Sequence, residues 1–356
     1  MSLLNCSPAE AEEILTEWIA SKGLPAYRSR QILPRLWSRP VGNWKDCTDL
    51  PKGLIDALET EYPIVRIELL KRLESTDGTV KYLWGLPDEA AIESVLIPEG
   101  RRRTLCISSQ VGCAYGCSFC TTGRMGFVRN LEPWEITAQV RELILESEGR
   151  EINNVVFMGM GEPLHNWGAV DVALSILNDP RGFRIGARRI CVSTVGIVPK
   201  LKMLAKRPEQ FRLALSLHSP FSDVRKQIMP VEGAFPLDDV LDALREFSRR
   251  VTFEYILIRN VNDRPEDLEQ LAEIARPIGA LVNLLSLHPG GPADLRPTSP
   301  EHVKRCAARL RALGIGVSVR RSRGLDISAA CGQLWSESKR SGKIVAGDDS
   351  HVEQEQ

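Results

Sequence analysis

The stretch Gly112-Cys113-Ala114-Tyr115-Gly116-Cys117-Ser118-Phe119-Cys120 places three cysteines within eight residues, in the spacing C-x3-C-x2-C. It follows an apolar run that begins at Thr104. Thiolates are the usual ligands of iron–sulfur clusters, and a four-iron cluster normally takes four of them. Three thiolates leave one iron open to a substrate. The spacing therefore predicts a reactive cluster held by Cys113, Cys117 and Cys120.

Three other roles for these cysteines are less favoured. Spacing i, i+4, i+7 would place them on one helix face, but the glycines at 112, 116 and 123 disfavour a helix. A structural zinc site needs four ligands, and the sequence has no second C-x2-C or H-x3-H pair. A disulfide framework is unexpected in a chain of 356 residues with nine cysteines, an odd number.

The composition describes a neutral chain that is long enough for one large domain and a smaller one. Its net charge of zero neither favours nor excludes a nucleic-acid partner. No apolar run reaches the length of about 18 residues that a membrane span needs, and the N-terminus lacks the pattern of a signal peptide. Because thiols and an oxygen-sensitive cluster need a reducing compartment, we expect a cytoplasmic protein with no membrane partner.

The hydrophobic patterning changes along the chain. Helical periodicity predicts helices at 8–20, 29–37 and 53–59, and alternation predicts antiparallel strands at 80–84 and 91–97. From Thr104 onward, predicted strands alternate with predicted helices, which favours a parallel α/β barrel or partial barrel. Those strands are 104–108, 154–158, 189–194, 211–218, 251–258, 280–287 and 316–319, and the helices are 134–148, 237–249, 265–275 and 300–313.

These patterns divide the chain into four parts. We expect a helical accessory domain at 1–65, a β-hairpin connector at 66–100, a barrel core at 101–335 and a disordered polar tail at 336–356. The active site of such a barrel lies at the carboxyl ends of the strands, and the cysteine stretch falls at one of them.

Polar residues also follow three successive strands. They are Gly161 and Glu162 in a Gly-Glu-Pro turn, Ser193 and Thr194, and Ser216, Leu217 and His218. A Gly-Glu-Pro sequence alone is more often a plain turn, and a lone histidine is more often a structural group than a ligand. Their occurrence at successive strand ends beyond the cysteine stretch favours a ligand site.

Two further cysteines have an informative context. Cys106 lies on the strand that leads into the cysteine stretch, and Cys331 lies in Ala329-Ala330-Cys331-Gly332-Gln333-Leu334, after the last strand. A buried thiol that packs as a small apolar group is the ordinary interpretation of each. The remaining cysteines, Cys6, Cys47, Cys191 and Cys306, keep that interpretation.

The motifs together resemble the RlmN/Cfr family of radical S-adenosylmethionine (SAM) RNA adenosine methyltransferases, over residues 24–335. The resemblance rests on residues 110–123 around the cysteines, on Arg129-Asn130-Leu131, on Gly159-Met160-Gly161-Glu162-Pro163-Leu164, and on the stretch around Cys331. It implies a partial (β/α)6 radical SAM barrel, a [4Fe-4S] cluster and two SAM molecules per turnover.

The resemblance also implies a mechanism. Cys331 becomes an S-methylcysteine intermediate that joins its methyl carbon to adenine, and Cys106 releases the product by forming a transient disulfide with Cys331. Glu93 matches the family's proton acceptor. The implied SAM contacts are Gly161, Glu162, Ser193, Ser216, Leu217 and His218. His288 stands where the family commonly has asparagine, and it is a further candidate for a SAM contact.

The implied substrate is C2 of an adenosine in 23S rRNA, at the peptidyl-transferase centre, with adenosine 37 of tRNAs as a second substrate. A flavodoxin-like electron donor and a monomeric protein are implied as well. Two alternatives stay open: C8 methylation of 23S rRNA, which is the antibiotic-resistance activity of the family, and a non-catalytic RNA-binding protein with a structural metal. Basic clusters that could contact RNA phosphates occur at 101–103, 188–189, 249–250 and 320–323.

Overall fold

A computed structural model describes residues 2–146, 152–288, 295–330 and 332–334 of the chain. The helices are α1 (Pro8–Ser21), α2 (Tyr27–Leu36), α3 (Lys52–Glu61), α4 (Thr121–Arg124), α5 (Pro133–Glu146), α6 (Trp167–Asn178), α7 (Val198–Ala205), α8 (Ser222–Ile228), α9 (Leu237–Leu244), α10 (Pro265–Ile278) and α11 (Pro300–Ala312). The strands are β1 (Glu68–Glu74), β2 (Val80–Gly85), β3 (Ala91–Glu99), β4 (Arg102–Cys106), β5 (Gln110–Gly112), β6 (Phe127–Asn130), β7 (Asn154–Phe157), β8 (Ile190–Thr194), β9 (Arg212–Ser216), β10 (Val251–Leu257), β11 (Leu281–Ser286) and β12 (Val317–Val319).

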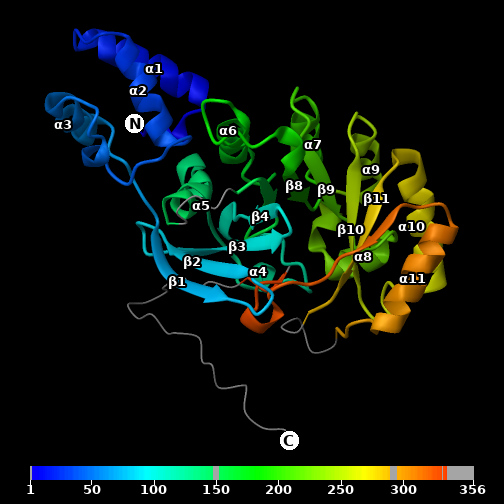
Figure 1. Cartoon of the computed structure of the whole chain (residues 1–356). Coiled ribbons are helices and arrows are strands. Elements are labelled where there is room, and N and C mark those ends of the chain that lie inside the picture. The colour runs from blue at the N-terminus through cyan, green and yellow to red at the C-terminus, as the bar shows by residue number, and fades with distance from the viewer. Residues whose placement is uncertain (1, 147–151, 289–294, 331, 335–356) are drawn as a thin grey trace, which may run out of the picture.

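Ten of these strands form one sheet in the order β1-β2-β3-β4-β7-β8-β9-β10-β11-β12. The strands from β1 to β4 pair antiparallel, whereas every neighbouring pair from β4 to β12 is parallel. Helices connect the parallel strands and cover one face of the curved sheet (Figure 1). This is the crossover pattern of a parallel α/β fold, and it confirms the predicted partial barrel.

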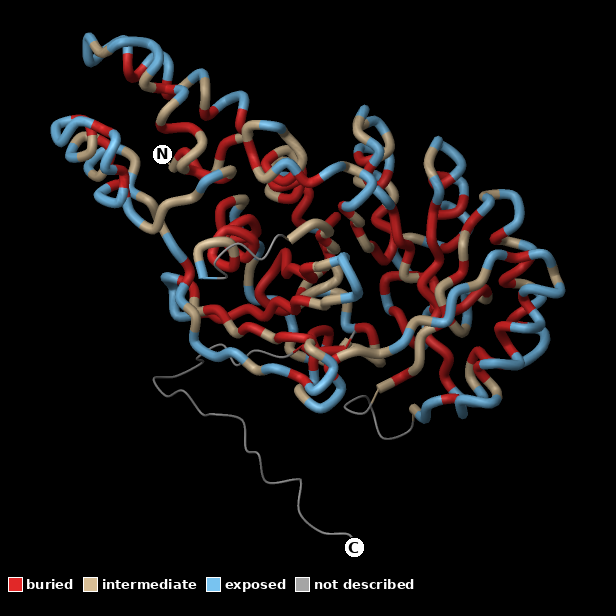
Figure 2. Tube along the Cα trace, viewed as in Figure 1, coloured by how far each residue is buried: buried red, intermediate tan, exposed pale blue. Residues whose placement is uncertain are grey.

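Each parallel strand predicted from the sequence is present within a few residues of its expected position. The strand β10 is buried along its whole length, as expected from its largely apolar sequence, although Thr252 and Glu254 interrupt that pattern (Figure 2). The helix predicted at 237–249 is wrong at its end, because α9 stops at Leu244. Beyond it, Glu246 and Phe247 bond the carbonyls three residues back, a tighter turn than an α-helix makes.

Several elements were not predicted. The helices α7 and α8 have eight and seven residues, too few to show a helical period. The two-stranded sheet of β5 and β6 encloses the cysteine stretch, and α4 begins directly after Cys120. The expected tail at 336–356 lies outside the described residues.

The N-terminal helices lie beside α5 and α6 in Figure 1. The guanidinium of Arg141, a buried residue of α5, donates to the backbone carbonyl of Leu36, the last residue of α2, and to that of Val41 beyond it. Arg66 forms an ion pair of 2.6 Å with the buried Glu142. Helix α5 therefore anchors the N-terminal helices through buried polar contacts. Among the described residues, no helix has the length and apolar character to cross a membrane.

Candidate active site

The cysteine stretch forms a loop between β5 and α4 that depends on glycine at its start. Gly112 has a φ of +73°, and a Cβ there would lie 1.9 Å from the carbonyl oxygen of Gly126. The Cys113 amide donates to that same oxygen at 2.9 Å, and the Cys120 amide donates to the carbonyl of Cys117 at 3.1 Å. A side chain at 112 would therefore force apart the two strands that hold the loop.

The three thiols influence one another electrostatically. Burial raises the pKa of Cys113 to about 12, and the charges of Glu162 and Cys120 add to this rise. Burial also raises the pKa of Cys117, and Cys120 and Cys113 raise it further. One buried and two half-buried thiols that oppose one another's ionisation need a cationic partner to become thiolates together. This donor set fits a cluster that carries positively charged iron.

The described side chains contain no group of three His, Cys, Asp or Glu residues that could hold one metal ion. In a four-iron cluster each thiolate binds a different iron, so its ligands surround a cage instead of a single ion. The loop geometry is compatible with that arrangement.

The Gly-Glu-Pro turn after β7 packs tightly against the start of the cysteine loop. Gly161 has a φ of +95°, and a Cβ there would lie 2.5 Å from the side chain of Gln110. The Gln110 side-chain oxygen accepts a hydrogen bond of 2.8 Å from the Glu162 amide. The sequence pattern gave this glutamine no separate role, yet it joins the two loops.

Glu162 is a buried carboxylate beside the cysteines. Its two oxygens accept hydrogen bonds from the amides of Leu164 at 3.0 Å and Val195 at 2.9 Å. Burial raises its pKa to about 7, against the opposing effect of hydrogen bonds from Thr194 and these amides. The negative charge of Glu162 also raises the pKa values of Cys113, Cys117 and Tyr115. This residue therefore faces the region where the predicted cluster and SAM would meet.

The next strand ends complete the same edge. Ser193 and Ser216 lie half-buried at the ends of β8 and β9, and Leu217 is fully buried. The His218 ring meets Phe119 of the cysteine loop edge to face, with centroids 4.6 Å apart. The structure thus brings the predicted SAM contacts on β9 against the cysteine loop.

Arg225 of α8 is a site residue that the sequence did not reveal. Its buried guanidinium donates to the carbonyls of Leu217 at 3.2 Å and Val195 at 2.8 Å, and it pairs with the buried Glu232. It fixes the ends of β8 and β9 relative to each other. A single arginine in a short helix carries no sequence signal for this role.

His218 remains neutral in the folded protein. Its Nδ1 accepts a hydrogen bond of 3.0 Å from the Ile256 amide, and burial lowers its pKa to about 3, aided by the charge of Arg225. Its φ of 57° is positive, a conformation that asparagine tolerates well.

We expect His218 to make stability fall as the pH falls below about 6.5, because the unfolded chain then binds a proton that the folded chain does not. Between pH 7 and pH 5 the expected loss is about 2 kcal/mol of unfolding free energy. Denaturant unfolding of wild type and His218→Asn at both pH values measures this difference. Equal pH dependence in the two proteins would contradict it.

Glu93 and Cys106 lie on adjacent strands. Val95 pairs directly with Cys106, and Glu93 lies two residues before Val95, on the same face of β3. The buried Glu93 carboxylate forms an ion pair of 3.1 Å with Lys81. The Lys81 ammonium also donates to the carbonyl of Ser328 at 3.3 Å. Lys81 therefore joins the predicted proton acceptor to the segment that precedes Cys331.

Cys331 itself lies outside the described residues, but both flanks of it are held. On the N-terminal side of Cys331, Ser75 donates to the carboxylate of Asp326 at 2.6 Å. On the C-terminal side of Cys331, the Thr121 amide of α4 donates to the carbonyl of Gly332 at 2.7 Å. The hairpin turn before β2 and the cysteine loop therefore hold the segment on either side of Cys331.

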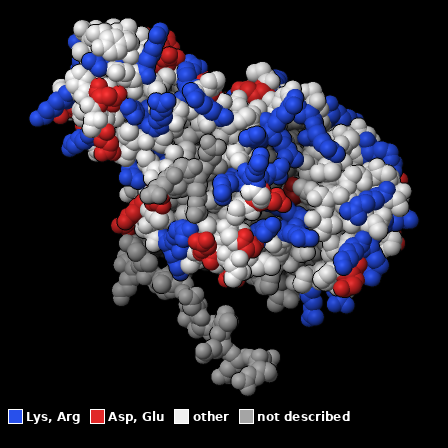
Figure 3. Space-filling model, viewed as in Figure 1, with Lys and Arg blue, Asp and Glu red and all other residues white. Residues whose placement is uncertain are grey.

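A cavity of about 510 Å³ opens on the inner face of the sheet, next to Ala329 and Ala330. Six arginines and two glutamates line it: Arg102, Arg189, Arg212, Arg320, Arg321, Arg323, Glu99 and Glu254. Three of the four basic clusters seen in the sequence thus converge on one cavity. Figure 3 shows basic side chains gathered across the middle of the face in view.

The cavity wall also includes Cys191 and His288. Cys6, Cys47 and Cys306 are buried, as expected for packing thiols. The Nε2 of His288 lies 2.8 Å from the Ser322 hydroxyl, and burial lowers the pKa of its ring. This histidine therefore contacts the segment after β12, and its contact with SAM stays a prediction.

Comparison with known proteins gives the family. The model of the radical SAM superfamily matches residues 107–275. The probable dual-specificity RNA methyltransferase RlmN of Gemmatimonas aurantiaca is 52% identical over 335 residues, covering 94% of this chain and 93% of the relative. RlmN of Syntrophobacter fumaroxidans is 42% identical over 328 residues, covering 91% of this chain and 96% of the relative.

A solved structure agrees. The crystal structure of a radical SAM methyltransferase from Sphaerobacter thermophilus matches with a TM-score of 0.88 and 42% identity, over 94% of this chain and 99% of that chain. These likenesses favour the enzyme over a non-catalytic RNA-binding protein with a structural metal. The chain belongs to the RlmN family of radical SAM RNA methyltransferases.

Proposed function

We propose that the protein methylates C2 of an adenosine in 23S rRNA and, as a second substrate, adenosine 37 of tRNAs. The observation that carries this proposal is the arrangement around Lys81. This residue contacts both Glu93 and the segment before Cys331, while Cys106 lies on the strand next to Glu93. A proton acceptor, a resolving thiol and a methyl-carrying thiol are the three groups that methylation through cysteine needs. The dual specificity in the relatives' names fits two RNA substrates.

The cofactors would be held at the edge formed by the strand ends. Cys113, Cys117 and Cys120 would hold the [4Fe-4S] cluster, and the polar residues after β7, β8 and β9 would bind SAM, two molecules per turnover. When bound, the cluster supplies the electron that cleaves SAM and starts radical chemistry, with an electron donor such as flavodoxin as its source. Glu162 would accept a hydrogen bond from the amino group of SAM.

The chain's own residues then divide the remaining work. The Cys331 sulfur carries the methyl group, whose carbon loses one hydrogen atom and becomes bonded to the adenine ring carbon. Glu93 accepts the proton that the ring carbon loses. The Cys106 thiolate attacks the Cys331 sulfur, so that an S–S bond forms while the bond from sulfur to the product carbon breaks, and the released carbon takes up a proton to become the product methyl group. An external reductant then restores both thiols.

The charges support an RNA substrate. The arginines of the cavity can neutralise phosphates near the bound adenosine, and each such contact adds affinity that falls with salt. We assign the N-terminal helices, residues 1–65, as an accessory RNA-binding domain. Helix α2 presents Tyr27, which is 51% exposed, with the Arg28 guanidinium 4.9 Å from its ring centroid. An exposed aromatic ring with an arginine is a common contact for unpaired bases.

Nucleoside mass spectrometry tests the proposal. Ribosomal RNA and tRNA from cells with and without the gene are digested and compared. We expect 2-methyladenosine to disappear from both RNAs when the gene is deleted and to return when it is restored. If 8-methyladenosine changes instead, the regiochemistry is wrong. If no methyladenosine changes, the proposed function is wrong.

A further inference from the structure

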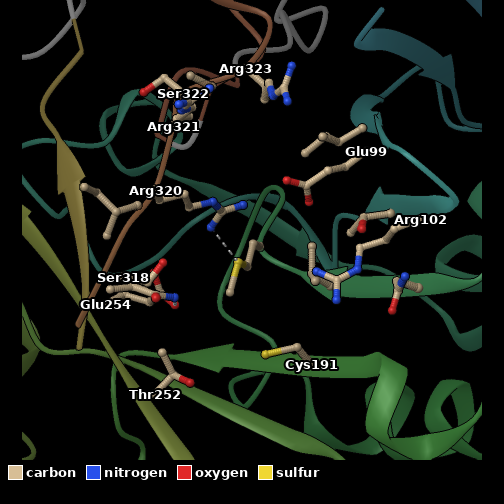
Figure 4. Close-up of a pocket in the computed structure, with 18 of the residues that line it drawn as sticks. Glu99, Arg102, Cys191, Thr252, Glu254, Ser318, Arg320, Arg321, Ser322 and Arg323 are labelled. Atoms are coloured by element: carbon tan, nitrogen blue, oxygen red, sulfur yellow. Dashed lines mark hydrogen bonds between the residues drawn. The ribbon is translucent and has the colours of Figure 1, made fainter. Parts of the chain in front are cut away.

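One oxygen of the Glu254 carboxylate has no hydrogen-bond partner within the described part of the chain. Glu254 lies on β10, is 6% exposed and lines the cavity (Figure 4). Its Oε1 accepts a hydrogen bond of 2.9 Å from Asn283, its direct neighbour on β11. Its Oε2 is buried and accepts none. The carboxylate is therefore oriented by Asn283 with one acceptor left for a ligand.

Such a group is costly without a ligand. An unsatisfied buried acceptor destabilises a protein, and it does so more strongly when it is charged. Burial raises the pKa of Glu254, while the charges of Arg320 and Arg212 lower it. Native proteins keep few groups of this kind, and they commonly mark functional sites. Because the strand backbone fixes Glu254 in the cavity wall, the missing partner is to be sought in what the cavity binds.

The cavity chemistry limits what that partner is. Six arginines attract phosphate groups, whereas the carboxylate repels them and accepts from N–H or O–H donors. A ligand that suits both carries a phosphate and a neutral donor, as a nucleotide does. A volume of about 510 Å³ lies within the usual range for sites that bind small molecules or single nucleotides.

We propose that Glu254 recognises the substrate base by accepting a hydrogen bond from the exocyclic amino group of the target adenine, with Asn283 as its positioning residue. This inference rests on the proposed function, because it takes adenosine as the substrate. Carboxylates read amino groups on base edges in other protein–nucleic acid complexes. Glu254 thereby selects adenine against a purine that lacks the amino group.

The test measures methylation by the full-length, anaerobically reconstituted enzyme on three RNA hairpins of the same ribosomal sequence. The target position carries adenosine, purine riboside, which lacks the amino group, or 2′-deoxyadenosine. For wild type we expect kcat/KM to be about tenfold to a hundredfold lower with purine riboside than with adenosine. In Glu254→Gln we expect this ratio to fall to about one, because the glutamine amide still accepts from Asn283 but turns its NH₂ toward the base.

Glu99→Gln is the matched control, since it removes the same charge from an exposed position on the cavity rim. It should keep the wild-type ratio of adenosine to purine riboside while changing affinity equally for all three hairpins. The inference is overturned if Glu254→Gln keeps that ratio, if it alters discrimination against 2′-deoxyadenosine instead, or if it changes only the KM for SAM. Absence of methylation by wild type on every hairpin would reject the proposed function itself.

Discussion

RNA incubated with the Cys106→Ala variant is expected to stay covalently attached to the protein. Without the Cys106 thiolate, the bond between the Cys331 sulfur and the product carbon forms but is not broken. Multiple turnover should fall by at least about a thousandfold, as happens when a residue of covalent chemistry is removed. A denaturing gel should show a band of protein with bound RNA that disappears after nuclease treatment.

Two further variants serve as controls for the covalent attachment of RNA to Cys106→Ala. Cys331→Ala should give neither an attached RNA nor a methylated one, because it lacks the sulfur that carries the methyl group. Cys306→Ala, which removes a buried thiol of α11, should methylate RNA without leaving an adduct. If Cys106→Ala released methylated RNA at the wild-type rate, Cys106 would have no role in product release.

The Cys117→Ser variant is expected to lose the iron–sulfur cluster and all SAM cleavage. The buried serine hydroxyl ionises far less readily than a thiol and is a poor ligand for iron, and the other two thiols then hold the cluster by two bonds. After anaerobic reconstitution, wild type should contain about four iron ions per chain. The variant should contain less than about one and should form no 5′-deoxyadenosine.

Cys306→Ser provides the control for replacing a buried sulfur with oxygen. It should retain iron and SAM cleavage, since Cys306 lies on α11, away from the cysteine loop. Iron content is measured by colorimetric assay and cleavage by chromatography. Full iron content in Cys117→Ser would show that Cys117 is not a ligand.

Much of the fold could be predicted because its signals are local. Apolar runs of strand length lie in the sequence where the parallel strands form, and β10 is the clearest example, with every residue buried. The cysteine triad is equally visible in the sequence, since the three ligands predicted for the cluster are neighbours in the chain. The resemblance to the family rests on motifs of this short-range kind.

The walls of the site could not be predicted, because they depend on contacts between distant segments. In the sequence, Lys81 is one polar residue of an alternating strand. The structure shows that it contacts both Glu93 and the carbonyl of Ser328. Glu254 interrupts an apolar run without any motif around it, and its unsatisfied oxygen becomes apparent once Asn283 is placed on the next strand. The spacing of residues along the chain predicts ligands that are close together in the sequence. It gives no information on contacts between distant residues that the pairing of strands brings together.

The contacts of Arg141 with the carbonyls near α2 set a limit on how the chain can be shortened. A chain beginning at about residue 66 would keep the barrel strands but leave this guanidinium without two of its acceptors and remove the cover from α5. The cut would expose apolar surface and leave the guanidinium with its Glu142 ion pair but without those two carbonyls, a combination that favours aggregation. Studies of RNA binding are therefore better made by surface substitutions on the N-terminal helices than by removing them, because α5 depends on this region to satisfy a buried guanidinium.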